Sequence, residues 1–335
     1  MSKPITNEVL PENLLEHRAV QAWSRLQPER IKPEAIEILK LKNKSAVYRL
    51  AGVGPAGSAV IAKRCRTPTA RIERMIHEEF VPHLSIAGLR CYGFVEEPGG
   101  DYCWLFLEEA TGQAYSPLDP EHRALAGRWL GTIHTAAIES GLESRLPARQ
   151  PSHYLNLLRT SHEDLVRHFA NPALRPNDIE VLRVLASYCR SLEAHWNELE
   201  EICDRMPRTL VHGDFVIKNV RVRSVAGSLV LLVFDWEYTG WGVPATDLAQ
   251  FTGYTVSPDL QTYRVTVEKS GATLDGLDSN RVAKCGQFFR LIDDVSWASS
   301  GLVFKSYIFL EKPISYLRLY VPRMAEALRA AGWKE

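Results

Sequence analysis

The sequence predicts an α+β protein with a small β-rich lobe followed by a larger, mainly helical lobe. Between Ile36 and Lys63, apolar and β-branched residues alternate with polar ones and turn residues separate the segments, which is typical of antiparallel strands. After Gly112 the apolar spacing becomes helical over most of the remaining chain. A chain of 335 residues also has room for two such lobes.

The periodicity of apolar residues divides the chain into a definite order of elements. The expected elements are a helix at 12–26, strands at 36–39, 46–50 and 59–62, a helix at 69–84, strands at 89–96 and 102–108, helices at 120–140, 154–169 and 177–203, a short β segment at 209–235, and mostly helix from 246. This order predicts three parts: a helical extension over 1–33, a β-rich lobe over 34–110, and a helical lobe over 111–335.

Composition narrows the class of protein. The 40 basic and 40 acidic residues cancel, and this balance favours neither a nucleic-acid nor a membrane-surface partner. The six cysteines are scattered, without Cys-x-x-Cys pairs or zinc spacing, which is typical of reduced thiols. The N-terminal segment is polar and no apolar stretch approaches the roughly 20 residues of a membrane span. We therefore expect a cytoplasmic protein.

Two motifs carry the chemistry. The first is His212-Gly213-Asp214 with Asn219 five residues later, and the second is Asp235 at the end of a very apolar strand. Phosphoryl transfer needs one carboxylate to orient the acceptor hydroxyl and accept its proton, and further oxygen ligands to hold Mg²⁺ on the nucleotide phosphates. This pattern predicts Asp214 as the catalytic base or orienting residue, and Asn219 and Asp235 as metal ligands.

The motifs resemble the aminoglycoside phosphotransferase and choline kinase superfamily, the small-molecule relatives of eukaryotic protein kinases. The resemblance spans about residues 36–250 and rests on His212-Gly213-Asp214 with Asn219, Asp235-Trp236-Glu237, Gly242-Val243-Pro244 with Asp247-Leu248-Ala249, Leu130-Gly131-Thr132-Ile133-His134, and Ala62-Lys63. It implies a bilobal protein-kinase-like fold in which ATP binds with Mg²⁺ between the lobes. The lobe at 34–110 would bind the nucleotide, and the lobe at 111–335 would carry catalysis and the acceptor.

The resemblance also assigns residues of the β-rich lobe. Lys63 would contact the α- and β-phosphates, with a glutamate of the following helix as its ion-pair partner. Glu78 fits best by its distance to the next strand, whereas Glu79 lies on the apolar side of the helix and competes. We favour Glu78.

The adenine would be read by the backbone of the segment that connects the lobes, at Leu107, Glu108 and Ala110. The turn at 41–46 lacks the glycines with which protein kinases cover the phosphates, so Ser45, backbone amides, and Lys42 or Lys44 would supply these contacts. His212 is expected to be a buried scaffold residue, and Asp247 to bond the backbone of the catalytic loop.

The acceptor is open at this point. The C-terminal lobe contains Asp293 and Asp294 but also many basic residues, and this balance weakens the case for a polycationic antibiotic. The sequence predicts an ATP- and Mg²⁺-dependent phosphotransferase acting on a hydroxyl of a sugar, amino alcohol, nucleoside or antibiotic-like metabolite. The alternative is a catalytically inactive nucleotide-binding or interaction protein with the same fold.

Overall fold

The structure is a computed structural model that describes residues 7–9, 11–29, 32–42, 45–250, 253–271 and 279–333. The chain forms two compact units: unit 1 comprises Met1–Tyr115 and Asn219–Tyr238, and unit 2 comprises Ser116–Lys218 and Thr239–Glu335. The predicted α+β class is confirmed. No helix within the described ranges combines the length and apolar character needed to span a bilayer.

Unit 1 is built on an antiparallel sheet. Among the described residues, six strands pair in the order β1-β2-β3-β4-β6-β5. Their bounds are β1 Asn7–Glu8, β2 Ile36–Lys42, β3 Ser45–Leu50, β4 Val60–Arg66, β5 Cys91–Glu96 and β6 Tyr102–Glu108. The five strands predicted from sequence alternation are all present, and β2 and β4 extend further than expected.

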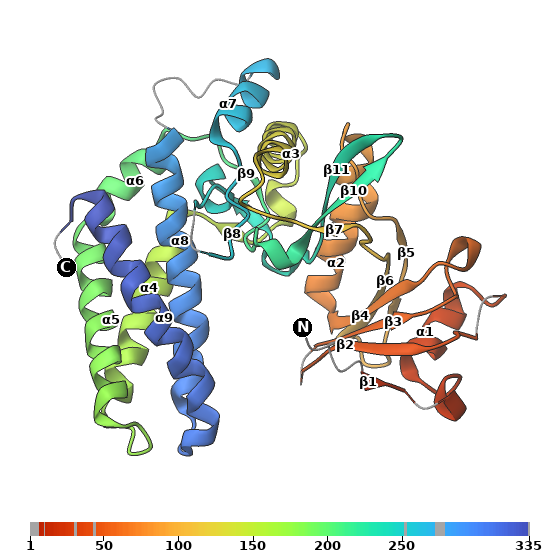
Figure 1. Cartoon of the computed structure of the whole chain (residues 1–335), viewed down its shortest axis with the longest axis horizontal. Helices are drawn as coiled ribbons and strands as arrows, with labels where there is room; N and C mark the ends of the chain where they lie inside the picture. Colours follow the sequence, from red (N-terminus) through yellow and green to blue (C-terminus); the bar gives the residue numbers. More distant parts are fainter. Residues whose placement is uncertain are drawn as a thin grey trace. The chain divides into compact units, whose positions relative to one another are not determined.

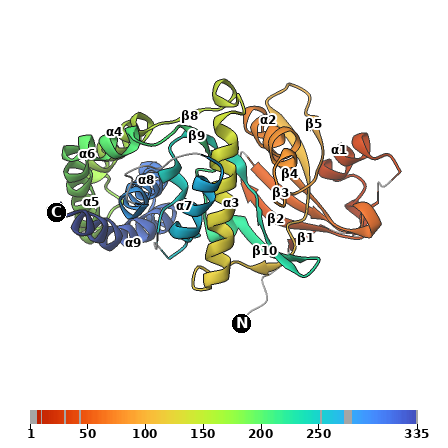
Figure 2. The same cartoon turned by 90° about the horizontal axis from the view of Figure 1, so that it is seen from above.

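Two helices cover opposite faces of this sheet (Figure 2). Helix α1 (Arg18–Leu26) buries Trp23 against Phe106, with ring centroids 5.2 Å apart, and Ala62 belongs to the same core. Helix α2 (Thr67–Met75) continues as a π-helical turn at Ile76–Phe80 and contacts β4 and β6. Because side chains alternate along a strand, Lys63 next to Ala62 points to the α2 face.

A second, three-stranded sheet completes unit 1. Its strands pair in the order β11-β10-β7, with bounds β7 Gln113–Ala114, β10 Val220–Val225 and β11 Ser228–Val233. Arg221 pairs with Ala114, so the β10–β11 hairpin is joined to the strand that follows β6. This long-range pairing places Asn219–Tyr238 in unit 1, whereas the domain division expected from the sequence left that segment in the helical lobe.

Unit 2 is mainly helical. Its helices are α3 Pro120–Ile138, α4 Pro151–Arg167, α5 Pro176–Ala194, α6 Trp196–Asp204, α7 Leu260–Lys269, α8 Ser279–Ser299 and α9 Tyr307–Ala331, and its strands are β8 Ala148–Arg149, β9 Thr209–Val211 and β12 Gly240–Gly242. Helices α4, α5, α8 and α9 pack into a four-helix group (Figure 1). The helix expected at 177–203 is divided at His195 into α5 and α6.

Glycines allow close packing at two points of unit 2. A Cβ atom at Gly131 of α3 would lie 2.7 Å from Thr266 Cβ of α7, so only glycine permits this approach of the two helices. At Gly286 of α8, a Cβ atom would lie 1.9 Å from the carbonyl oxygen of Ala245. Helices α7 and α8 therefore pack directly against the segments that support the loop after β9.

Candidate active site

Lys63 is a buried cation in the middle of β4. It pairs in register with Val47 of β3 and Leu105 of β6, and only 6% of its surface is exposed. Its ammonium group donates to Glu73 Oε2 and to Asp235 Oδ1, each at 2.6 Å. Burial disfavours the charged form, but the two carboxylates outweigh this effect and raise the pKa of Lys63. Lys63 is therefore held in its charged form by two anions of unit 1.

The prediction of Glu78 as the ion-pair partner of Lys63 is wrong, because the partner is Glu73. Glu73 is 1% exposed, whereas Glu78 lies near the surface and accepts a hydrogen bond from Arg74 at 2.6 Å. Burial raises the pKa of Glu73, and the neighbouring Lys63 opposes this shift. Its second oxygen, Oε1, is buried without a hydrogen-bond partner among the described residues.

Element lengths explain why Glu73 is the partner. Lys63 lies three residues before Arg66, the end of β4, which is about 10 Å along the strand. Glu73 lies six residues after Thr67, the start of α2, which is about 9 Å along the helix. A helix that folds back beside the strand therefore brings Glu73 level with Lys63. Glu78 lies about 17 Å from the start of the helix, well past the lysine.

Asn219 and Asp235 lie at the same end of the β10–β11 hairpin. Val220 pairs with Val233, and the Phe234 N–H donates to the Asn219 carbonyl at 3.1 Å. Asp235 adopts the left-handed conformation with φ of 66°, which Asp tolerates better than most residues. The side chain of Asn219 is buried, and that of Asp235 is 23% exposed. The two predicted metal ligands are thus brought together on one hairpin of unit 1.

The segment after β6 is fixed by ion pairs. Arg223 of β10 donates to the Glu108 carboxylate at 2.6 Å, to the Glu109 carbonyl at 3.1 Å and to the Thr111 carbonyl at 3.2 Å. Leu107 is buried in the sheet. No described protein group hydrogen-bonds the backbone N–H or C=O of Ala110. A rigid segment with an available backbone donor and acceptor can bind a planar heterocycle by its edge.

The turn between β2 and β3 is only partly described. Ser45 begins β3 and pairs with Lys42, the last residue of β2. Ser45 is half-buried, and Lys42 is exposed. Asn43 and Lys44, including the lysine considered as a phosphate contact, lie outside the described residues.

The loop that carries Asp214 follows β9 in unit 2 and is held by Asp247. The Asp247 carboxylate accepts from the His212 N–H at 2.6 Å and from the Gly213 N–H at 2.9 Å. It also contacts His134 Nε2 at 3.3 Å, which connects the Leu130–His134 segment of α3 to this loop. The predictions that Asp247 bonds the loop backbone and that His212 is buried are both confirmed.

Asp214 is 5% exposed and lies between two cations. Arg290 of α8 donates to Asp214 Oδ1 at 2.8 Å, and Lys218 Nζ lies 3.1 Å from Oδ2. Burial would raise the pKa of Asp214, but Arg290 and Lys218 together outweigh it, and the pKa is lowered. The carboxylate is therefore ionised at neutral pH and accepts hydrogen bonds rather than donating them.

Two further acids of α8 stand beside Asp214. Arg290 donates to Asp294 Oδ1 at 2.7 Å, and Asp293 lies 4.0 Å from Arg149. Burial raises the pKa of Asp293 to about 6 and that of Asp294 well above its usual range. From the sequence, Arg290 counted only as one of the basic residues of the C-terminal lobe. Its contact with Asp214 was missed because no local pattern connects it with a loop 76 residues earlier.

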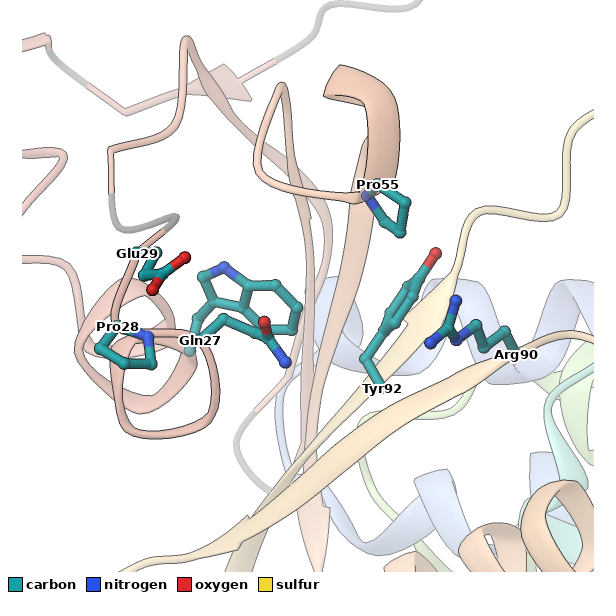
Figure 3. Close-up of a pocket in the computed structure, with 7 residues that line it drawn as sticks. Gln27, Pro28, Glu29, Pro55, Arg90 and Tyr92 are labelled. Carbon is teal, nitrogen blue, oxygen red and sulfur yellow. The ribbon is translucent and has the colours of Figure 1, made fainter.

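A cavity of about 520 Å³ lies elsewhere in unit 1, on the α1 side of the sheet (Figure 3). Figure 3 shows Gln27, Pro28 and Glu29 on one side and Arg90 and Tyr92 on the other. Its lining consists of Trp23, Gln27, Pro28, Glu29, Pro55, Arg90 and Tyr92. None of the predicted site residues lines it, and Lys63 points to the opposite face of the sheet.

Comparison with known proteins connects these features with a family. The family described as the phosphotransferase enzyme family matches residues 38–280, nearly three quarters of the chain. This range contains Lys63, Glu73, Asp214, Asn219 and Asp235. Among curated protein sequences, none matches this chain significantly.

Solved structures share the fold at low sequence identity. An aminoglycoside phosphotransferase in complex with GDP and kanamycin has a TM-score of 0.63 and 13% identity, over 90% of this chain and 97% of the other. Spectinomycin phosphotransferase in complex with ADP and spectinomycin has a TM-score of 0.60 and 11% identity, over 88% and 94%. Choline kinase from Cryptosporidium parvum Iowa II has a TM-score of 0.55 and 11% identity, over 89% and 91%.

Proposed function

Because the chain belongs to the phosphotransferase enzyme family, we propose that it transfers the γ-phosphoryl group of ATP to a hydroxyl of a small molecule in the presence of Mg²⁺. The family gives the reaction class, and the predicted resemblance to aminoglycoside and choline kinases is confirmed. In this proposal Asp214 receives the acceptor hydroxyl, Lys63 binds the nucleotide phosphates, and Asn219 and Asp235 bind the metal.

The observation that carries the proposal is the position of the buried Lys63 ammonium group between two carboxylates of unit 1. A lysine buried to this extent ordinarily loses its proton, because burial favours the neutral amine. Here Glu73 and Asp235, each 2.6 Å away, keep it protonated. Such a prearranged cation binds anions without reorganisation, and nucleotide phosphates are the anions that a phosphotransferase must hold.

The donor set at the hairpin end fits Mg²⁺. Asn219 and Asp235 offer an amide oxygen and a carboxylate, which are hard ligands, and Mg²⁺ usually takes only one or two protein carboxylates besides phosphates and water. Within the described ranges, no three His, Cys, Asp or Glu side chains form a metal-binding group. A site of one Asp and one Asn is compatible with that finding. When bound, Mg²⁺ would neutralise the negative charge of the phosphates.

In the proposed reaction, the acceptor oxygen displaces ADP from the γ-phosphorus of ATP. The acceptor oxygen forms a bond to the γ-phosphorus, the bond from the γ-phosphorus to the β–γ bridging oxygen breaks, and ADP leaves. The acceptor O–H bond breaks and its proton passes to Asp214. Because Asp247 fixes the backbone of the loop at His212 and Gly213, the position of the Asp214 carboxylate is set before the acceptor arrives.

The nucleotide base is assigned to the segment after β6. We propose that the backbone at Glu108 and Ala110 reads the base edge, that Leu107 packs nearby, and that Ser45 contacts phosphate. The unpaired backbone of Ala110 and the anchoring of this segment by Arg223 support the assignment. Backbone groups can bind the edge of more than one purine base. Of the structurally similar proteins, one was solved with GDP and another with ADP. The test therefore includes GTP.

The experiment measures nucleotide binding and turnover separately. ATP or GTP with Mg²⁺ should raise the melting temperature of the full chain, because a ligand that binds only the folded protein stabilises it. Asp214→Asn should keep this shift but lower acceptor-dependent ADP release by about 10²- to 10⁴-fold. Asp204→Asn, at an exposed position of α6, is the matched control and should keep its activity. Absence of any nucleotide-dependent shift would refute the proposal.

A further inference from the structure

Three buried polar atoms in the part of unit 2 that surrounds Asp214 have no hydrogen-bond partner among the described residues. They are the hydroxyl of Tyr254, Oδ2 of Asp294 and Nη1 of Arg323, and none of them bonds to any described residue. All three side chains belong to unit 2. Leaving a buried donor or acceptor unpaired costs about 1–3 kcal/mol, so native proteins rarely keep three together. Their side chains are connected with the proposed catalytic residue through Arg290, which makes them candidate contacts of a ligand bound at Asp214.

Contacts join these side chains into one cluster, defined here as the acceptor cluster: Tyr254, Arg290, Asp294 and Arg323. The Arg290 guanidinium bridges Asp214 Oδ1 at 2.8 Å and Asp294 Oδ1 at 2.7 Å. The guanidinium carbons of Arg290 and Arg323 lie 5.8 Å and 5.0 Å from the centroid of the Tyr254 ring. Asp214 and the side chains that carry the three unpaired atoms therefore belong to one connected group.

The charges of the cluster define the chemistry of its ligand. Arg290 already donates to both Asp214 and Asp294, whereas Arg323 keeps a buried N–H group without an acceptor. A guanidinium matches the geometry of a carboxylate or phosphate and cannot lose its proton. Asp294 is 5% exposed, and in its ionised form its Oδ2 atom accepts a hydrogen bond from a donor. The ligand must thus bring an anionic group for Arg323 and a donor for Asp294.

Resting on the proposed function, we propose that the phosphate acceptor is a small hydroxylated carboxylate, with its carboxylate bound to Arg323 and an ammonium or second hydroxyl group bound to Asp294. Its reacting hydroxyl lies at Asp214 and is phosphorylated by ATP as described above, with ADP as the leaving group. A polycation fits poorly, since Arg290 and Arg323 would repel it. Burial raises the pKa of Asp294, and a donor at Oδ2 would favour its ionised form.

The test compares acceptors that differ only in the carboxylate. The full chain with ATP and Mg²⁺ is assayed for ADP release with L-serine and L-homoserine, with the corresponding decarboxylated amines ethanolamine and 3-aminopropan-1-ol, and with kanamycin. At least one carboxylate should be used with a kcat/KM more than about 10²-fold above that of the matched amine, because the amine leaves Arg323 unpaired.

Arg323→Gln should remove this preference, mainly by raising the KM of the carboxylate acceptor. Since Nη1 of Arg323 has no hydrogen-bond partner among the described residues, its loss leaves none of their acceptors unpaired. Arg329→Gln, at an exposed position of the same helix, is the matched control and should keep the preference. Arg323→Lys retains the charge without the planar fork and should restore only part of the affinity.

The outcomes separate this inference from the proposed function. Equal or faster turnover of amines or kanamycin would overturn the inference and leave the phosphotransferase proposal intact. The inference also fails if no carboxylate is phosphorylated and none raises the melting temperature of the ATP-bound Asp214→Asn protein. The nucleotide-dependent shift of the wild-type protein tests the proposed function independently of any acceptor.

Discussion

Replacement of Glu73 by Ala should destabilise the protein far more than the same replacement at Glu78. Glu73 is a buried partner of Lys63 at 2.6 Å, and removing one partner of a buried ion pair costs about 3–5 kcal/mol. Lys63 keeps Asp235 as a second partner, so we expect a cost at or below the lower end of that range, about 2–3 kcal/mol. Glu78 forms an exposed pair with Arg74 four residues earlier, which contributes about 0.3–0.5 kcal/mol.

Urea unfolding of the two variants measures this difference, and the melting temperature provides a second readout. A difference of about 2 kcal/mol corresponds to a shift of about 4–8 °C for a chain unit of this size. The kcat/KM for ATP should also fall in Glu73→Ala and stay near the wild-type value in Glu78→Ala, because Glu73, unlike Glu78, is an ion-pair partner of Lys63. Equal losses of stability in the two variants, or a larger loss in Glu78→Ala, would refute the ion-pair assignment.

Two other predictions test the metal ligand and the acidic residues of α8. Asp235→Asn should abolish the Mg²⁺-dependent part of the ATP-induced rise in melting temperature while weaker metal-independent binding remains; an unchanged Mg²⁺ titration would contradict the assignment. Asp293 has its pKa raised to about 6 in the folded protein, so the folded state retains a proton that the unfolded state loses near pH 4. Ionisation of Asp293 should therefore lower the free energy of unfolding as pH rises from about 4 to about 6, by at most about 3 kcal/mol. Unfolding of wild type and Asp293→Asn across this window measures the effect, and parallel pH profiles would exclude it.

Local patterns predicted the elements of the fold well. The strands of unit 1 follow from the alternation of apolar residues, and helices α3, α4 and α5 from the spacing of their buried faces. The role of Asp247 was predicted alongside the family resemblance, since its contact with the loop backbone at His212 spans 35 residues and no local pattern records it. The strands and helices could be predicted because each depends on the spacing of apolar residues within one short segment of the sequence.

Features that depend on contacts between distant parts of the chain could not be predicted from the sequence. Glu73 was missed because α2 begins at Thr67, two residues earlier than expected, and begins directly at the end of an extended β4. The membership of the β10–β11 hairpin in unit 1 depends on pairing between Arg221 and Ala114, more than 100 residues apart. Arg290 acts on Asp214 through a contact between residues that are 76 positions apart. No local periodicity records such contacts.

The lowered pKa of Asp214 has a consequence for the proposed reaction. A carboxylate that Arg290 and Lys218 keep ionised is a weak proton acceptor before phosphoryl transfer begins. In a loose transition state the acceptor hydroxyl gains acidity late, so Asp214 would mainly orient the hydroxyl and take its proton as the new P–O bond forms. Because Arg290 bridges Asp214 and Asp294, the guanidinium that sets this basicity also positions the carboxylate proposed to recognise the acceptor. Acceptor recognition and orientation of the reacting hydroxyl would therefore depend on one side chain.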